Sequence, residues 1–529
     1  MKLLTRHITL ITLFLIAFTI AAKSQEKIKL PKKKVEEANY YYSFENYHLA
    51  LPVLKELYAM DSTNSDINYK IALCKFNTTR NKPEAKKYFE QSKNDFIDAY
   101  YYLGLICQLQ MNFDKAIELF QYYKYWYGKK SFTWDEADYH INKCLTAKTY
   151  ILHPVRVTIK NLGNTINSLS SDYVPLITSD ENTLFFTSRR EGSIGDKKDP
   201  LGEYFEDIYI SNKTDTGWSQ AQNLGTPVNS ETHDACVAIT PDGQKLFLYR
   251  TNSELTGGNI FISERQNNQW TEPVKIDAEI NTKEGLESSG TISPDESVFY
   301  FSSNRSGGYG GKDLYRVIKF PNGKWSKAQN MGPTINTPYD EDAPFIHPDG
   351  QTLYFSSKGH KNMGGYDIFK TVMNYEGEWS NPENLGYPLN SVHDDLFFVI
   401  TADNMRGYYS CDKEGNGNHE IFTIDMPENN SNYKLLKGVV LSNDSIPVTI
   451  KATIIITLID NQTNSLQGVY RTNKETGNYL FIVDPGKKYK IIIEAEGYES
   501  MIDWLEIPAI VEEQIIFKNI QLKRKKNTE

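Results

Sequence analysis

Pro294-Asp-Glu-Ser-Val-Phe-Tyr-Phe-Ser-Ser303 is one copy of a unit that recurs through the middle of this 529-residue chain. Each copy has a tight turn at an aspartate, followed by an apolar and aromatic strand. The turn aspartates stand 62, 53, 54 and 54 residues apart and are Asp180, Asp242, Asp295, Asp349 and Asp403. Alternating strands between such turns, repeated about every 54 residues, predict the blades of a β-propeller.

The two ends of the repeat region complement one another. The fifth unit stops after its third strand, near Met426, whereas Asn161-Leu-Gly-Asn-Thr-Ile-Asn-Ser168 copies the missing piece upstream of the first unit. A strand borrowed from upstream would complete the last unit and remove an exposed sheet edge. We therefore predict a five-bladed propeller over residues 155–427, closed by the strand near 155–168.

Residues 35–151 are predicted to be helical, since they hold very little Gly or Pro and their apolar residues recur at helical spacing. An alanine followed four residues later by a large apolar residue recurs at intervals of 35 and 31 residues: Ala50 and Leu54, Ala85 and Phe89, Ala116 and Phe120. The small residue admits a close neighbouring helix, as in tetratricopeptide repeats. Tyr41, Tyr101 and Tyr123 either line a concave binding surface or pack between helices.

The two ends of the chain differ from these regions. Residues 1–24 combine Lys2 and Arg6 with an apolar run and the segment Ala22-Lys-Ser24, which predicts a cleaved secretory signal peptide. Residues 435–523 return to alternating strands with Gly-rich turns, which predicts a small β-sandwich. The expected fold class is multidomain, with an α-helical array followed by two all-β domains.

Charge and cysteine content exclude several function classes. Removal of the signal peptide, with its three cations, takes the formal net charge from −9 to −12. Because the basic residues are scattered, nucleic acid is not an expected partner. The mature chain contains no second apolar segment that predicts a membrane span. Five widely spaced cysteines form no metal motif, and Cys74, Cys107 and Cys144 are predicted to be core residues.

An acidic residue stands eight positions before each turn aspartate. The five are Asp172, Asp234, Glu287, Glu341 and Asp395. One interpretation is a ring of carboxylates at one mouth of the channel that binds a cation, a basic side chain or an amine. The alternative is pairing across the hairpin, where Arg189, Thr251, Asn304, Lys358 and Asp412 are the expected neighbours.

The Gly-rich loops at 307–311 and 364–365 lie between predicted strands. Phosphate-binding loops precede a helix, so we interpret these segments as tight turns. No GxSxG or HExxH motif is present. We therefore expect no catalytic residues, cofactor or resident metal. The open alternatives are a ligand or metal sensor, with His233 and His393 beside acidic residues, and a propeller enzyme.

The order of modules resembles the envelope proteins of the OmpA family in Bacteroidota, including the periplasmic propeller component of type IX secretion and gliding. The resemblance rests on the helical repeats and on the TolB-like segment 301–315 (FSSNRSGGYGGKDLY). It also rests on a pattern that resembles the carboxypeptidase regulatory-like domain: Gly438-Val-Val440, Gly477-Asn-Tyr479, Gly486 with Tyr489, and Gly497-Tyr498. It implies a periplasmic, non-enzymatic scaffold at the outer membrane that binds envelope proteins. In that family a peptidoglycan-binding domain follows the sandwich, whereas this sequence ends at Glu529. We therefore expect attachment through protein partners instead of peptidoglycan.

Overall fold

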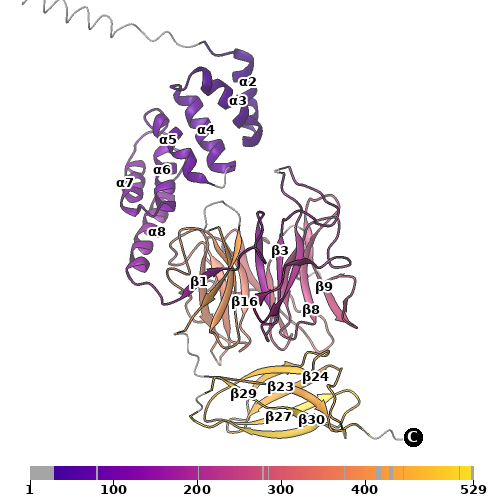
Figure 1. Cartoon of the computed structure of the whole chain (residues 1–529). Coiled ribbons are helices and arrows are strands. Elements are labelled where there is room, and N and C mark those ends of the chain that lie inside the picture. The colour runs from indigo at the N-terminus through magenta and orange to yellow at the C-terminus, as the bar shows by residue number, and fades with distance from the viewer. Residues whose placement is uncertain are drawn as a thin grey trace, which may run out of the picture. The chain divides into compact units, whose positions relative to one another are not determined.

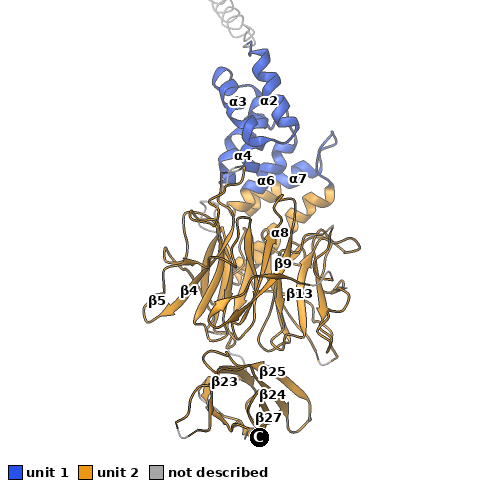
Figure 2. Ribbon diagram, turned by 90° about the vertical axis from the view of Figure 1, so that its right-hand side faces the viewer, with its two compact units in different colours: residues 1–106, 119–133 blue, residues 107–118, 134–529 orange. Residues whose placement is uncertain are grey.

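The computed structural model describes residues 29–525, except for 79–80, 201, 277–278, 284, 375, 413–418, 428–432, 445 and 511–512. The predicted signal peptide lies outside the described residues, and so does the linker at 428–432. The chain divides into two compact units (Figure 2). Unit 1 comprises residues 1–106 and 119–133, and unit 2 comprises residues 107–118 and 134–529.

The described residues before 153 form seven α-helices and one 3₁₀-helix. They are α2 (Lys32–Ser43), α3 (Tyr47–Met60), α4 (Ser65–Thr78), η1 (Lys82–Ala85), α5 (Lys86–Ser92), α6 (Asp98–Leu109), α7 (Phe113–Lys124) and α8 (Trp134–Leu152). The predicted alanines and large apolar residues all lie in the core, each at most 1 % exposed. Within this described part, no helix is both long and apolar enough to span a membrane.

Between residues 158 and 425 the described strands form five antiparallel sheets (Figure 1). The first sheet contains β2 (Asp172–Ile177), β3 (Thr183–Ser188), β4 (Asp207–Thr214), β5 (Gly217–Trp218) and β6 (Gln222–Asn223). The second contains β7 (Asp234–Ile239), β8 (Lys245–Thr251), β9 (Gly258–Gln266), β10 (Gln269–Trp270) and β11 (Val274–Lys275).

The third and fourth sheets repeat this order with four strands each. The third contains β12 (Gly290–Ile292), β13 (Val298–Ser303), β14 (Asp313–Ile318) and β15 (Gln329–Asn330). The fourth contains β16 (Glu341–Ile346), β17 (Thr352–Ser357), β18 (Asp367–Val372) and β19 (Glu383–Asn384). The fifth contains β20 (Asp395–Ile400), β21 (Arg406–Cys411), β22 (Glu420–Asp425) and β1 (Thr158–Asn161).

The first strands of the five sheets contact one another in the cyclic order β2, β7, β12, β16, β20 and back to β2. Separate apolar clusters fill the spaces between neighbouring sheets, such as the cluster of Val237, Phe247 and Phe299 between the second and third. Radially arranged four-stranded sheets with their first strands around a common centre are propeller-like.

The fifth sheet is completed by a strand from far upstream. β1 pairs antiparallel with β22, with Lys160 opposite Thr423, and Figure 1 shows its violet arrow beside the orange strands. The Asn167 side chain then binds both main-chain groups of Ile421, through Nδ2 to the carbonyl at 2.9 Å and through Oδ1 from the N–H at 2.8 Å. The first and last described segments of this region thus share one sheet.

Two further sheets follow residue 433. One contains β26 (Asn478–Val483), β23 (Lys434–Ser442), β29 (Ile515–Phe517) and β30 (Ile520–Leu522). The other contains β25 (Leu466–Arg471), β24 (Ile454–Asp460), β27 (Lys488–Ala495) and β28 (Met501–Glu506). Their side chains share one core, in which Leu436, Ile456 and Ile493 are fully buried.

Candidate functional site

The five repeated acidic residues begin the innermost strands or, for Glu287, stand just before one. Each is at most 2 % exposed. The narrow channel between the first strands has a volume of about 60 Å³, and its lining starts two residues or more beyond these carboxylates, at Val174 in the first sheet. The interpretation as a ring facing the channel therefore does not describe these side chains.

Each carboxylate instead binds the loop that precedes its own strand. Asp234 accepts hydrogen bonds from the Ser230 N–H and Oγ, both at 2.6 Å. The equivalent pairs are Asp172 with Ser168, Glu287 with Thr282, Glu341 with Thr337 and Asp395 with Ser391. A buried carboxylate that accepts main-chain and hydroxyl hydrogen bonds anchors the loop, in the manner of a helix N-cap.

The cations beside these acids differ from those predicted across the hairpin. Arg189 binds Asp199 at 2.6 Å, and Lys358 binds Asp340 at 2.8 Å. The acids pair with other arginines: Arg190 with Asp172, Arg250 with Asp234 and Arg305 with Glu287. Four of the five first strands contain a β-bulge, which takes up an extra residue and shifts the ladder by about one position.

Glu341 has no ion pair among the described residues and accepts hydrogen bonds from Thr337 and from Ser357 Oγ at 2.6 Å. Burial raises the pKa of Glu341 to about 7, above the usual 4.5. Protonation in this range therefore favours the folded state, and this contribution is lost as the pH rises through 7.

We expect the Glu341→Gln variant, which resembles the protonated form, to gain stability relative to the wild type as the pH rises from 5 to 8. The difference should change by on the order of 1–3 kcal/mol. Urea unfolding at both pH values measures it. Glu378→Gln, which changes an exposed acid, is the control. A pH-independent difference for Glu341→Gln would contradict this assignment.

A second set of acidic residues, at the start of the third strands, was not singled out in the sequence. Asp313 accepts the N–H groups of Tyr309 at 2.6 Å and Gly310 at 2.9 Å, and Asp367 accepts those of Met363 and Gly364. The glycine-rich loops thus direct their N–H groups at the protein's own carboxylates. Burial raises the pKa of Asp367 to about 7.

An asparagine clamp also recurs in each of the five sheets between residues 158 and 425. As Asn167 does at Ile421, Asn229 binds both main-chain groups of Ile208 at 2.9 Å. The same arrangement joins Asn281 to Ile260, Asn336 to Leu314 and Asn390 to Ile368. The clamp accounts for the repeated Asn, and the hydrogen bonds to the repeated acids account for the Ser or Thr that follows it.

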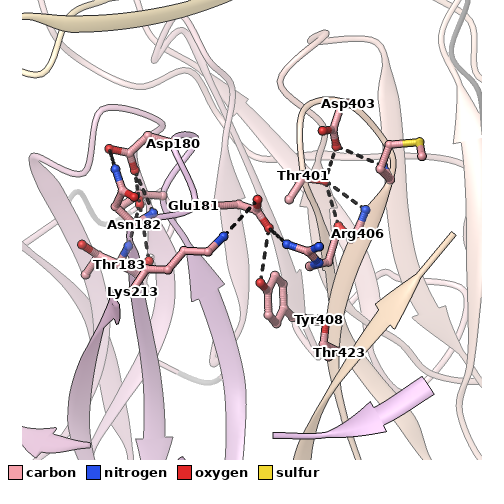
Figure 3. A network of polar contacts seen from close by, with 12 residues as sticks. Asp180, Glu181, Asn182, Thr183, Lys213, Thr401, Asp403, Arg406, Tyr408 and Thr423 are labelled. Carbon is pink, nitrogen blue, oxygen red and sulfur yellow. Dashed lines mark hydrogen bonds and ion pairs between the residues drawn. The ribbon is translucent and has the colours of Figure 1, made fainter. Parts of the chain in front are cut away.

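The junction between the first and fifth sheets carries a polar network (Figure 3). Glu181, in the turn after β2, accepts from Arg406 and from the Tyr408 hydroxyl, each at 3.3 Å, and from Lys213 at 3.5 Å. Burial, the largest single influence, lowers the pKa of Arg406. The nearby acids together outweigh burial and raise that pKa above its usual value. The network ties the two ends of the repeat region together on the turn side.

The two histidines of the sensor alternative each contact a carboxylate. His233 contacts Glu206, and His393 contacts Asp412 at 3.1 Å. No cluster of His, Cys, Asp or Glu in the described part of the chain has metal-binding geometry. All five cysteines are buried, which confirms the prediction for Cys74, Cys107 and Cys144 as core residues.

Of the three tyrosines proposed for a concave surface, two are buried in the core and one is partly exposed. Tyr101 is buried and stacks on Phe132 at 3.8 Å, and buried Tyr123 donates to Asp98 at 2.8 Å. Tyr41 is half-buried. Packing between helices therefore describes Tyr101 and Tyr123.

Exposed aromatic residues gather elsewhere in unit 1, at the end of α7 and just beyond it. We refer to Tyr122, Tyr125, Trp126 and Tyr127 as the α7 aromatic surface; their exposed fractions are 50, 59, 45 and 99 %. The Tyr122 ring lies 6.4 Å from that of Trp126 and 4.4 Å from that of Tyr100. The sequence alone does not distinguish these residues, because Phe113, Phe120 and Tyr123 of the same helix are buried aromatics.

No protein-family model matches the sequence, and none of the curated proteins searched matches it either. Solved structures do match, with propeller-type folds. Kuenenia stuttgartiensis hydrazine synthase is 15 % identical, with 62 % of this chain and 77 % of that chain covered and a TM-score of 0.27. A thermostable family-43 glycoside hydrolase is 10 % identical, covering 50 % and 90 %, with a TM-score of 0.34.

An α-L-arabinofuranosidase from Lactobacillus brevis is 12 % identical, covering 50 % of this chain and 93 % of that chain, with a TM-score of 0.33. Two of these three structures are therefore glycoside-cleaving enzymes, which contradicts the prediction that the chain is not an enzyme. With TM-scores under 0.5, the likeness assigns no activity or substrate to this chain. The resemblance to the OmpA family stays a prediction.

Proposed function

We propose that this chain is an exported scaffold of the cell envelope that binds other envelope proteins. In this proposal the helices are tetratricopeptide-like repeats, the five sheets are the blades of a closed propeller, and residues 435–523 are a β-sandwich. The cyclic contacts of the first strands and the pairing of β1 with β22 support the propeller. Fold alone does not identify a function, so the proposal depends on a surface.

The observation that carries the proposal is the α7 aromatic surface. Aromatic residues are enriched at protein interfaces, and contiguous exposed apolar patches commonly mark binding sites. Large rings also bury much area at a small cost in conformational entropy when a partner covers them. The most repeated polar residues of unit 2, by contrast, are engaged in hydrogen bonds that hold its own loops.

Site-specific photocrosslinking tests this proposal in intact cells. With p-benzoylphenylalanine in place of Tyr127, we expect adducts with one or a few envelope proteins. The matched control carries the same amino acid at Trp504, an exposed aromatic residue of β28 at 57 % exposure. Trp126→Ser should reduce the yield at position 127. Equal adducts at both positions, or no envelope protein at position 127, would overturn the proposal.

A further inference from the structure

A second cavity in unit 2, of about 280 Å³, is large enough for a small organic molecule. One wall consists of the turns that follow the first strands, including Thr178 to Asp180 and Thr240 to Gly243. The other wall consists of residues of β23, β25 and β26 with the segments beside them. Figure 3 shows the Asp180 turn that forms one part of the first wall.

Polar contacts connect the two walls beside the cavity. Asn473 Nδ2 donates to the Asp242 carbonyl at 3.1 Å, and the Arg471 guanidinium lies 3.1 Å from the Glu296 carboxylate. Glu296 is 7 % exposed and also contacts Lys245. Because charged partners from both sides meet there, the cavity has a defined polar rim.

The acidic residues of the lining are already engaged. Asp180 accepts from Thr178 Oγ1 at 2.7 Å, and Asp242 accepts from Thr240 Oγ1 at 2.6 Å and from the Gln244 N–H at 3.0 Å. These bonds hold the turns themselves, and Glu296 is occupied by two cations. The lining carboxylates are therefore poor candidates for binding a cationic ligand.

Two cationic residues of the lining are not engaged in this way. Among the described residues, the buried Arg265 Nε has no hydrogen-bond partner, and the Lys437 ammonium has neither an ion pair nor a hydrogen bond. A buried guanidinium nitrogen without a partner is costly, and an anionic group that accepts from it removes this cost. Among the lining residues that the structure describes, Arg265 and Lys437 are thus the two cations that have no carboxylate partner.

Apolar groups form much of the remaining lining. Pro241, Pro294 and Pro348 come from equivalent turns of three sheets, and Val439 and Tyr479 come from the opposite wall. Walls of this kind favour binding of a ligand whose main part is apolar and either flat or compact. We propose that this cavity binds a small organic carboxylate with an aromatic or apolar body, whose anionic end lies against Arg265 and Lys437. The inference is independent of the scaffold function.

A pair of probes that differ in charge but hardly in shape tests the proposal. Indole-3-acetate and indole-3-acetamide are titrated calorimetrically into the full chain. We expect the acid to bind about tenfold or more tightly than the amide, because only the acid offers a charged acceptor. In the Arg265→Gln/Lys437→Gln variant this preference should fall below about twofold.

The control variant, Arg316→Gln/Lys451→Gln, removes the same two charges outside the cavity and should keep the preference. Far-UV circular dichroism verifies that both variants are folded, and Lys437→Gln alone provides a milder change should the double variant unfold. Equal binding of the two probes, binding of neither, or an undiminished preference in folded Arg265→Gln/Lys437→Gln would each overturn the proposal.

Discussion

Replacing Asp234 with alanine is expected to lower the free energy of unfolding by about 3–5 kcal/mol. Asp234 is fully buried and lies 2.5 Å from Arg250 Nε, besides accepting both hydrogen bonds of Ser230. Truncation leaves a largely buried guanidinium without its carboxylate and a loop N–H without its acceptor. Burial raises the pKa of Asp234, so the intact acid is itself costly to ionise, yet the loss of its partners costs more.

Glu272→Ala is the matched control for this experiment. Glu272 lies 3.9 Å from the same arginine but its side chain is 77 % exposed. An exposed ion pair contributes little, so this change should cost less than about 1 kcal/mol. The double variant Asp234→Ala/Arg250→Leu should recover part of the loss, since no unpaired charge is left. Equal effects of Asp234→Ala and Glu272→Ala in urea unfolding would contradict the anchoring role.

Replacing Asn167 with alanine is expected to cost about 1–3 kcal/mol, because it leaves the N–H of buried Ile421 unpaired. The Ile421 carbonyl loses one of its two donors and keeps the Leu162 N–H at 3.1 Å. The loss should be localised at the junction of the ring. In the wild type the clamp helps to hold β1 against β22. Without it, amide hydrogen exchange should accelerate in β22.

Two control variants distinguish an effect at the junction from the general cost of losing a clamp. Asn229→Ala removes the same clamp inside continuous chain, so it should cost stability without accelerating exchange in β22. Asn164→Ala, at an exposed position three residues from Asn167, should have little effect. Unchanged exchange in β22 of Asn167→Ala would show that the clamp does not hold the junction.

The repeat length and the incomplete last unit could be read from the sequence, because turn aspartates and aromatic strands recur at nearly constant spacing. The orphan copy at 161–168 led to the expectation of a strand from upstream in the last sheet, and β1 pairs with β22 in the structure. The helical region was predictable for a similar reason: its small and large apolar residues keep a fixed spacing. These are long-range patterns that many residues share.

The roles of single polar residues could not be read in the same way. Counting across the hairpin selected Arg189 as the partner of Asp172. The β-bulge between Tyr173 and Leu176 instead places Ser188 opposite Asp172, and Arg190, two residues further along, forms the ion pair. The sequence does not mark this bulge. Val174 lies within it and adopts a φ of 52°, a conformation that valine disfavours, so its residue type does not predict the bulge.

The orientation of the repeated acids was hidden for a related reason. Recurrence shows that a carboxylate is needed in each unit, but not whether it faces the channel or the protein's own loop. Asp313 and the clamp asparagines accept hydrogen bonds from main-chain N–H groups. Their role can be recognised only when the positions of those N–H groups are known. The α7 aromatic surface was missed because exposure depends on how the helices pack.

Closure of the ring by β1 is the central claim, and a disulfide between Lys160→Cys and Thr423→Cys tests it most directly. These residues face each other in the ladder, although 263 residues separate them in sequence, and the five native cysteines are buried. The control pairs Lys160→Cys with Lys370→Cys, the equivalent position of the fourth sheet. Mild oxidation followed by non-reducing electrophoresis should show a rapid intramolecular crosslink in the first variant only. A crosslink in neither variant, or equally in both, would contradict the closure.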